Sequence, residues 1–204
     1  SFDILKGPKK CPLLISLNYF FYGSCFMTNV VHVIVGLEVG GAELMLSRLV
    51  DECSKNFDCQ QTIISLKTAG NLGDEIEKTM SGVDVISLNM NSMLSFPLVF
   101  YKLVRVFKLV RPQVVYTWMY HSDLVGGIAA YICGIRNICW GIRCTEIPQS
   151  SVSVTALIIK ICAFLSYYIP RKIICCADSA KQTHIALGYC EEKMAVIPNG
   201  YDLK

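Results

Sequence analysis

Charged residues are scarce in this sequence. They make up 17% of its 204 residues, and the net charge is only +3. A protein that follows nucleic-acid phosphates needs a dense basic face, so this balance argues against a nucleic-acid-binding function. Hydrophobic residues make up 53% of the chain, which is too apolar for a disordered protein. We therefore expect one domain with a full core and some apolar surface covered by a partner.

Histidine is also scarce. His32, His121 and His184 are isolated from one another, and no pair of cysteines has the spacing of a zinc site. We predict no metal site and no bound cofactor. The eleven cysteines lie inside apolar runs, which indicates buried thiols in a reducing, cytoplasmic compartment.

The two ends of the chain lack the patterns of a folded domain. Residues 1–28 carry three lysines and an apolar stretch, but no small-residue cleavage site follows. We interpret them as a leader outside the fold, with Met27 as the natural start. Residues 198–204 begin with the turn Pro198-Asn199-Gly200, so we interpret them as the start of a linker. The expected domain covers residues 29–197.

Apolar runs of strand length alternate with helical segments along this domain. The runs are continuously apolar, as expected for parallel strands covered on both faces. We expect strands at 30–35, 61–65, 83–87, 114–117, 137–142, 172–176 and 194–197, and helices at 42–55, 74–80, 96–110, 122–133, 155–168 and 179–187. This alternation predicts an α/β fold with a doubly wound, Rossmann-like parallel sheet, in which ligands bind beyond the carboxyl ends of the strands.

A glycine-rich loop follows the first predicted strand and leads into a helix. Gly40 and Gly41 let the backbone approach a ligand closely, and the helix N-terminus offers N–H groups to an anion. The glycine spacing is not that of a dinucleotide fingerprint, and the second strand runs into Lys67 where such a site needs an acidic residue. The loop is therefore a candidate phosphate site, with a tight turn as the alternative.

Polar and aromatic residues follow the fourth predicted strand. His121 is expected at the strand end, beside the aromatic ring of Trp118, which can stack on a sugar or lipid ring. Ser122 or Asp123 is expected to cap the helix that follows. The alternative is that His121 has only a structural role in the helix-capping turn.

Arg143 is expected at the same edge, after the fifth strand. A guanidinium there can bind a phosphate or an acidic sugar through two parallel hydrogen bonds. The alternative is an ion pair between Arg143 and Glu146.

Five segments in this order resemble one known family. They are Gly40-Gly41-Ala42-Glu43, the run from Thr117 to Leu124, Trp140-Gly141-Ile142-Arg143, Ala177-Asp178-Ser179 with Gly188-Tyr189, and the run from Val196 to Asp202. Together they resemble the retaining glycosyltransferases of family 4, which have GT-B architecture. The resemblance covers about Val30 to Lys204 and implies the N-terminal, acceptor-side half of a GT-B fold. Cys144-Thr145 departs from the family pattern after Arg143.

The resemblance implies an enzyme that transfers a hexose from a nucleotide-sugar to a glycan or lipid-linked acceptor with retention, in polysaccharide or glycolipid biosynthesis. It implies catalytic, positioning roles for His121 and Asp123. It implies substrate binding by Gly40, Gly41, Glu43, Trp118 and Arg143. The donor-binding half is expected beyond residue 204, so the 204-residue chain is expected to be inactive alone.

Two apolar segments carry cations and suggest contact with a membrane surface. Residues 96–110 contain Lys102, Arg105 and Lys108, and residues 155–168 contain Lys160. Both segments are shorter than the roughly 20 residues of a membrane span, which favours peripheral contact at the inner face of the cell membrane. Core helices with solvated charges are the alternative. A Rossmann-type oxidoreductase and a non-catalytic membrane-associated module remain as alternative functions.

Overall fold

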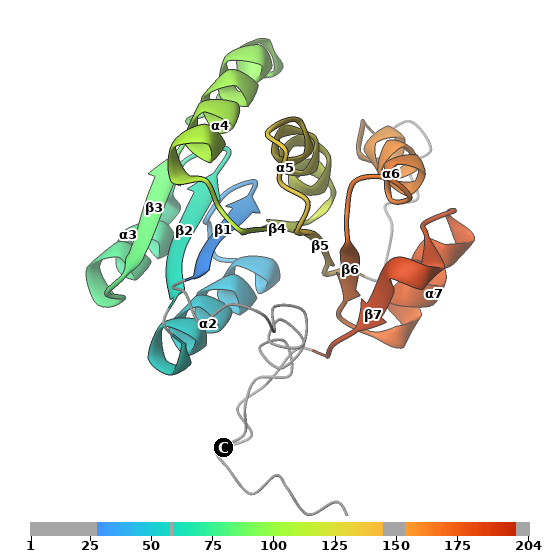
Figure 1. Cartoon of the computed structure of the whole chain (residues 1–204), viewed down its shortest axis with the longest axis horizontal. Coiled ribbons are helices and arrows are strands. Elements are labelled where there is room, and N and C mark those ends of the chain that lie inside the picture. The colour runs from blue at the N-terminus through green and yellow to red at the C-terminus, as the bar shows by residue number, and fades with distance from the viewer. Residues whose placement is uncertain (1–27, 58, 145–153, 199–204) are drawn as a thin grey trace, which may run out of the picture.

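The computed structural model describes residues 28–57, 59–144 and 154–198 (Figure 1). The predicted leader, except Thr28, and the predicted linker, except Pro198, lie outside these residues. The strands are β1 (Thr28–Ile34), β2 (Cys59–Ser65), β3 (Val83–Ser87), β4 (Val114–Trp118), β5 (Ile138–Ile142), β6 (Lys172–Cys175) and β7 (Met194–Val196). The helices are α2 (Gly41–Asn56), α3 (Gly70–Thr79), α4 (Phe96–Val110), α5 (Tyr120–Ile132), α6 (Val154–Leu165) and α7 (Asp178–Ala186), with short 3-10 turns at Met93–Ser95 and Glu191–Lys193.

The strands form one parallel sheet in the order β3-β2-β1-β4-β5-β6-β7. The chain builds outward from β1 to β3, returns through α4, and then builds outward in the other direction from β4 to β7. This confirms the predicted doubly wound, Rossmann-like sheet. The order reverses between β1 and β4, and such a switch point leaves a crevice at the carboxyl ends of the strands.

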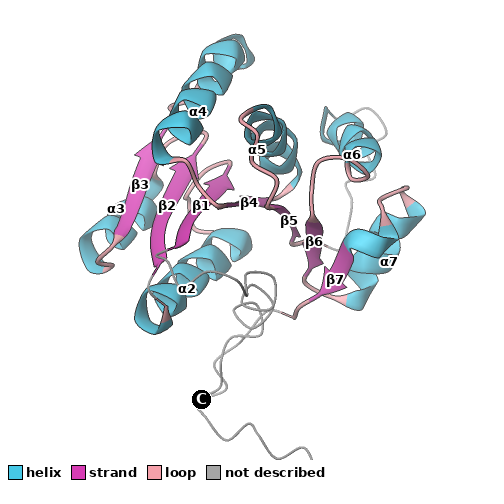
Figure 2. Ribbon diagram, viewed as in Figure 1, coloured by secondary structure: helices cyan, strands magenta, loops and turns pink. Residues whose placement is uncertain are grey.

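Helices cover both faces of the sheet. Figure 2 shows α4, α5 and α6 on one side and α2 and α3 on the other. Two apolar cores result. One contains residues of α4, α5 and α6, with Val31 and Val33 of β1, and the other contains residues of α2 and α3, with Ile34. Because both faces are buried, the strands are apolar on both sides, as their sequences predicted.

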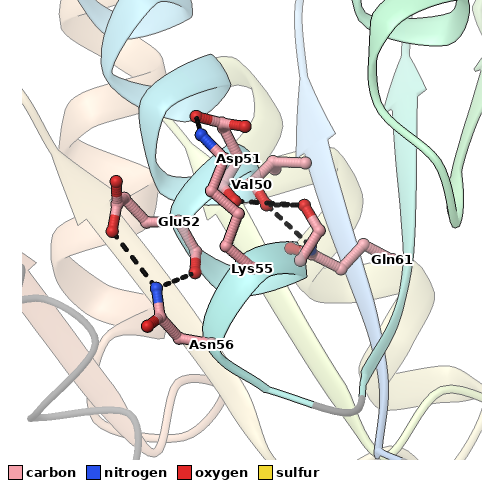
Figure 3. Close-up of polar contacts among 7 residues, drawn as sticks. Val50, Asp51, Glu52, Lys55, Asn56 and Gln61 are labelled. Atoms are coloured by element: carbon pink, nitrogen blue, oxygen red, sulfur yellow. Dashed lines mark hydrogen bonds and ion pairs between the residues drawn. The ribbon is translucent and has the colours of Figure 1, made fainter.

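Polar contacts complete the docking of α2 on the sheet (Figure 3). The buried amide of Gln61, on β2, donates to the backbone oxygen of Val50 at 2.9 Å. Lys55 pairs with Asp51 one helical turn earlier at 2.5 Å. The ion pair is exposed and contributes little, whereas the Gln61 hydrogen bond joins the helix to the sheet inside the protein.

Two helices begin two or more residues earlier than predicted. Helix α3 starts at Gly70 instead of residue 74, because Leu72 and Gly73 bury against the sheet layer and Leu37, and this packing overrides the poor helix propensity of glycine. Helix α5 starts at Tyr120 instead of residue 122. Met119 occupies the N-cap position, so the predicted capping by Ser122 or Asp123 is wrong.

Gly126 lets α5 approach the sheet at the switch point. A Cβ atom there would lie 2.9 Å from Cγ2 of Thr117, on β4, and 3.2 Å from Cβ of Val33, on β1. Cβ of Val33 is attached directly to the strand backbone and Cγ2 of Thr117 is one bond further out, so both atoms have little room to move. By contrast, a Cβ on Gly41, in the first turn of α2, would meet no atom within 4 Å.

Gly126→Ala is expected to lower the free energy of unfolding by up to about 2 kcal/mol, because an overpacking cost of about 1–3 kcal/mol outweighs the gain of about 1 kcal/mol in helix propensity. Urea denaturation at neutral pH measures this. Gly41→Ala is the matched control and should leave stability within about 0.5 kcal/mol or raise it. Equal stability of the two variants would show that α5 does not need the close approach.

Candidate functional site

The switch point brings two helix N-termini to one edge of the sheet. Helix α2 follows β1 and helix α5 follows β4, and these two strands are neighbours, with Val33 paired to Thr117. The helices lie on opposite faces of the sheet. Each N-terminus carries a partial positive charge of about half an elementary charge, so the crevice between them suits an anion.

The glycine loop leaves the start of α2 open. Gly40 is the N-cap residue, and no side chain caps the helix. Gly41 is exposed, with open space where a side chain would be. The carboxylate of Glu43 folds back against Gly40 and is the neighbour that a Cβ there would meet. The first-turn N–H groups beside Gly41 are thus accessible to a ligand, while Glu43 lies over the preceding residue.

The turn between β4 and α5 is held in a conformation that non-glycine residues rarely adopt. Met119 has φ 70° and ψ 158°. Its N–H donates to the oxygen of Gly141 at 3.0 Å, and its oxygen accepts from the N–H of Asp123 at 2.9 Å. Such strain costs on the order of 1–3 kcal/mol and occurs most often at functional sites. It fixes the direction in which His121, two residues later, leaves the strand.

His121 lies half-buried in the first turn of α5. Burial, and secondarily the positive charge of Lys67, lower the pKa of its imidazole below the usual 6.5. At neutral pH the ring is therefore uncharged and can accept a proton or a hydrogen bond. Lys67 is exposed just beyond the end of β2, two strands away from β4 in the sheet. It adds a positive charge to this edge that the sequence analysis did not assign to the site.

Asp123 lies below the edge of the sheet. Its side chain is 0% exposed, and Thr117 Oγ1 is 2.5 Å from its Oδ1 and 3.3 Å from the backbone oxygen of Cys139. Burial raises the pKa of the Asp123 carboxyl well above 3.8, although Thr117 and the backbone of Gly141 act in the opposite direction. A neutral Asp123 carboxyl can donate its proton to Thr117 Oγ1. The Thr117 hydroxyl can then donate to the backbone oxygen of Cys139. Asp123 thus joins α5 to β4 and β5, and its catalytic role stays a prediction.

Trp118 is buried too, within a cluster of aromatic and cationic groups. Its indole N–H donates to Nδ1 of His32 at 3.4 Å, and the guanidinium of Arg143 lies over its ring, 4.8 Å from the centroid. Arg143 also donates to the hydroxyl of Tyr116 at 3.0 Å. A Cβ on Gly141 would lie 2.9 Å from the Tyr116 ring, so the absent side chain makes room for it. Trp118 is 0% exposed and supports Arg143 instead of offering its ring to a sugar in this conformation.

A second buried chain of hydrogen bonds lies on the opposite face of the sheet. Nδ1 of His184 is 2.6 Å from the oxygen of Ala180, which can only accept, so Nδ1 carries the proton. Burial lowers the pKa of His184 and keeps the ring neutral. Its Nε2 therefore accepts from the hydroxyl of Tyr120 at 2.8 Å, and that oxygen accepts from the thiol of Cys144 at 3.0 Å. This chain ties α7 and the end of β5 to the first residue of α5.

The predicted site residues thus divide into two groups. Gly40, Gly41, Glu43, His121 and Arg143 reach the carboxyl edge of three adjacent strands, β1, β4 and β5, as predicted. Asp123 and Trp118 lie beneath that edge as supports. The supports His32, Tyr116 and His184 were not predicted from the sequence. Only strand order and register bring His32 and Tyr116 beside Trp118, and only the packing of α7 brings His184 beside Tyr120.

The fold and this edge define the class of the protein. The described residues form one Rossmann-like domain of the kind found in GT-B glycosyltransferase structures, with the N-termini of α2 and α5 at the carboxyl ends of β1 and β4. The family model described as Glycosyltransferase Family 4 matches residues 39–204. The chain therefore belongs to glycosyltransferase family 4, and the resemblance found in the sequence is confirmed.

Solved structures share the fold at low sequence identity. The structure of Alr3699/HepE from Anabaena in complex with UDP superposes with a TM-score of 0.68 at 19% identity and covers 86% of this chain and 45% of that chain. UDP-N-acetylglucosamine 2-epimerase from Rickettsia bellii gives 0.63 at 17% identity, covering 85% and 45%. The apo form of the lipopolysaccharide outer core galactosyltransferase WaaB gives 0.60 at 16% identity, covering 87% and 47%. The chain thus spans less than half the length of these structures. No curated protein matches it.

The cluster beneath Arg143 predicts a pH dependence of stability. Burial lowers the pKa of His32 to about 4, while a contact with Gln61 acts in the opposite direction. Between pH 6.5 and pH 4 the unfolded chain binds a proton that the folded protein excludes. Stability therefore falls as the pH falls through this window, by roughly 3 kcal/mol in total for this one residue.

His32→Gln removes this proton linkage. The difference in unfolding free energy between wild type and His32→Gln should shrink by roughly 3 kcal/mol from pH 6.5 to pH 4, and it should be constant above pH 7. Urea denaturation of both proteins across this range measures the difference. Because the comparison subtracts all shared titrations, including that of Asp123, a constant difference would show that His32 is not buried in its neutral form.

Proposed function

We propose that this chain is the acceptor-side half of a retaining glycosyltransferase that transfers a hexose from a nucleotide-sugar to a glycan or lipid-linked acceptor. The observation that carries the proposal is the family match together with the open N-terminus of α2 at the switch point. A structure of HepE is described in complex with UDP-glucose, and WaaB is named a galactosyltransferase, which supports a nucleotide-sugar donor. Polysaccharide or glycolipid biosynthesis at the inner face of the cell membrane fits such an acceptor.

In the proposed mechanism, some residues stabilise the leaving diphosphate and others position the acceptor. The N–H groups beside Gly41, with the positive charges of Lys67 and Arg143, stabilise negative charge that develops on the departing diphosphate. His121, uncharged at neutral pH, accepts a hydrogen bond from a neighbouring, non-reacting hydroxyl of the acceptor or the sugar and so positions the reacting hydroxyl beside the leaving diphosphate. The departing phosphate takes the hydroxyl proton, so that the new bond forms on the face that the diphosphate leaves.

Asp123 and Trp118 have supporting roles in this proposal. Asp123 holds the turn that carries His121, and Trp118 holds the guanidinium of Arg143 from below. Glu43 lies over Gly40, where it limits the approach of a second anion. Direct contacts with the substrates are thus assigned to the loop at Gly41, to His121 and to Arg143.

Transfer should require a second, donor-binding domain, because in a GT-B enzyme the cleft closes between two domains. The 204-residue chain is expected to transfer no sugar from UDP-glucose, UDP-galactose or GDP-mannose, whereas a two-domain protein that begins with this chain is expected to glycosylate an extracted lipid or glycan. Transfer of radiolabelled sugar measures both. Turnover by the 204-residue chain alone would contradict the claim that transfer requires a second, donor-binding domain.

His121→Ala in the two-domain protein tests the site in the same assay. Loss of a positioned polar contact in the transition state should lower kcat/KM by roughly a hundredfold, with an unchanged melting temperature. His121→Gln retains a hydrogen-bond acceptor and should recover part of the activity. The control, His184→Gln, alters a histidine that lies below the edge and should act mainly on stability. Normal turnover of folded His121→Ala would remove this residue from the site.

We further propose that α6 contacts the membrane surface peripherally. Leu157, Ile161 and Phe164 recur at helical spacing on its outer side, and Tyr168 lies just beyond its end. Leu157, Phe164 and Tyr168 are each more than 60% exposed. Lys160 is exposed beside them. An apolar face with a cation suits insertion into an anionic lipid surface. In the described ranges, no helix is long and apolar enough to cross a bilayer.

Co-sedimentation with vesicles that contain anionic phospholipid tests the contact. Phe164→Ser should reduce binding at least about tenfold, because burial of such a ring in lipid contributes roughly 1.5–3 kcal/mol. Leu94→Ser alters another exposed apolar side chain, away from α6, and should leave binding unchanged. Equal binding of wild type and Phe164→Ser would mean that α6 does not face the membrane.

A further inference from the structure

A cavity of about 580 Å³ lies at the amino edge of the sheet, opposite the candidate site. It forms between the loop that joins α4 to β4 and the loop that joins α5 to β5. Its walls include Phe107, Pro112, Cys133 and Ile135, which give it an apolar floor. This volume is within the range of small-molecule sites, which is about 300–1,000 Å³. The five residues of β4 separate the cavity from the carboxyl edge by roughly 17 Å, so it does not belong to the nucleotide-sugar crevice.

Three cations line this cavity. Lys108 belongs to the last turn of α4, Arg111 follows that helix, and Arg136 follows α5. All three side chains are exposed, and no aspartate or glutamate is among the lining residues. In the part of the chain that the structure describes, the ion pairs of Lys55 and Lys181 lie elsewhere, and none joins these three cations to a carboxylate. Three like charges thus converge on one hollow.

The helix ends neutralise only part of this positive charge. The C-termini of α4 and α5 point toward the cavity, and together they carry a partial charge of about −1. The three side chains carry three positive charges. A surplus of about two positive charges therefore remains, which matches the charge of a phosphate monoester near neutral pH.

The geometry of the loops holds the cations in place. Arg111 has φ 47° and ψ 57°, a left-handed conformation that glycine or asparagine usually adopts, and Pro112 follows it. The guanidinium of Arg136 lies 4.3 Å from the centroid of the Tyr131 ring. Arg171 extends the basic band along the same edge, where it donates to Asn137 at 2.6 Å. This conformation ends α4 and leaves Arg111 among the residues that line the cavity.

We propose that this cavity binds a phosphate monoester on an organic stem. The phosphate pairs with Lys108, Arg111 and Arg136, and the stem lies on the apolar floor formed by Phe107 and Ile135. The monoester has two sources, a soluble metabolite or the headgroup of a lipid such as phosphatidic acid. In either case the site is separate from the crevice at the carboxyl edge and can be occupied together with it.

Binding to the 204-residue chain tests the site with two probes. Glycerol 3-phosphate, measured by calorimetry, represents the soluble source. Vesicles of phosphatidylcholine with and without phosphatidic acid, measured by co-sedimentation, represent the lipid source. The double variant Lys108→Gln/Arg136→Gln is expected to lose at least about tenfold in affinity for whichever probe binds, because each lost partner is a charge-assisted hydrogen bond. The control is Arg48→Gln/Lys78→Gln, which removes two exposed cations on α2 and α3.

Each outcome decides the proposal. Binding of glycerol 3-phosphate that the double variant loses and the control retains supports the site with a soluble ligand. Binding only to vesicles with phosphatidic acid, again lost by the double variant alone, supports the lipid source. Absence of binding to both probes, or an equal loss in the control, overturns the proposal. The single variants Lys108→Gln and Arg136→Gln change exposed side chains and provide the same comparison with partial losses if the double variant does not fold.

Discussion

The pairing of β1 with β4 is the constraint on which the rest of the structure depends. It joins the first three strands to the last four, and it is the only parallel pair in the described sheet whose strands are separated by two others in the chain. Helix α5 can seal this junction because Gly126 brings its backbone against Val33 and Thr117. The same junction places the beginnings of α2 and α5 on either side of one crevice. Fold and candidate site therefore have a common origin.

The site is built in two levels. At the edge lie the open first turn of α2, His121 and the guanidinium of Arg143. Below it, buried groups fix their directions: Asp123 bonded to Thr117, Trp118 beneath Arg143, and Tyr120 bonded to His184. Burial shifts the pKa values of these supporting groups toward their neutral forms, so the level below the edge carries little charge of its own. The cations at the edge are left to act on a ligand.

Much of the fold could be predicted from the sequence, for a physical reason. Buried parallel strands are continuously apolar, and amphipathic helices alternate with them, so the seven strands and six helices can be located within a few residues. The helix starts are predicted less accurately. Leu72 and Gly73 enter α3 because of contacts with Leu37 and the sheet that no local pattern reveals. Met119 takes a backbone conformation that its residue type does not suggest, and this displaces the predicted cap.

Of the candidate site, only the residues at the carboxyl edge of the sheet could be predicted as neighbours from the sequence. Strand ends in a parallel sheet meet at one edge, so the order of strands and loops along the chain is enough to group Gly41, His121 and Arg143. Burial of Trp118 and Asp123 could not be foreseen, because it depends on the register that puts His32 opposite Tyr116 and on the space left by Gly141. The basic cavity at the opposite edge could not be foreseen either, since its three cations come from the last turn of α4 and from two loops, which only the β4–β5 pairing brings together.

The central claim is that the carboxyl edge at β1 and β4 faces the nucleotide-sugar. Backbone amide chemical shifts of the two-domain protein, followed by NMR during titration with UDP-glucose, test it most directly. The account predicts that the amide signals of Gly41 and His121 shift with a common saturation curve, while those of Arg111 and Arg136 at the amino edge do not change. Saturable binding that leaves the signals of Gly41 and His121 in place would contradict it.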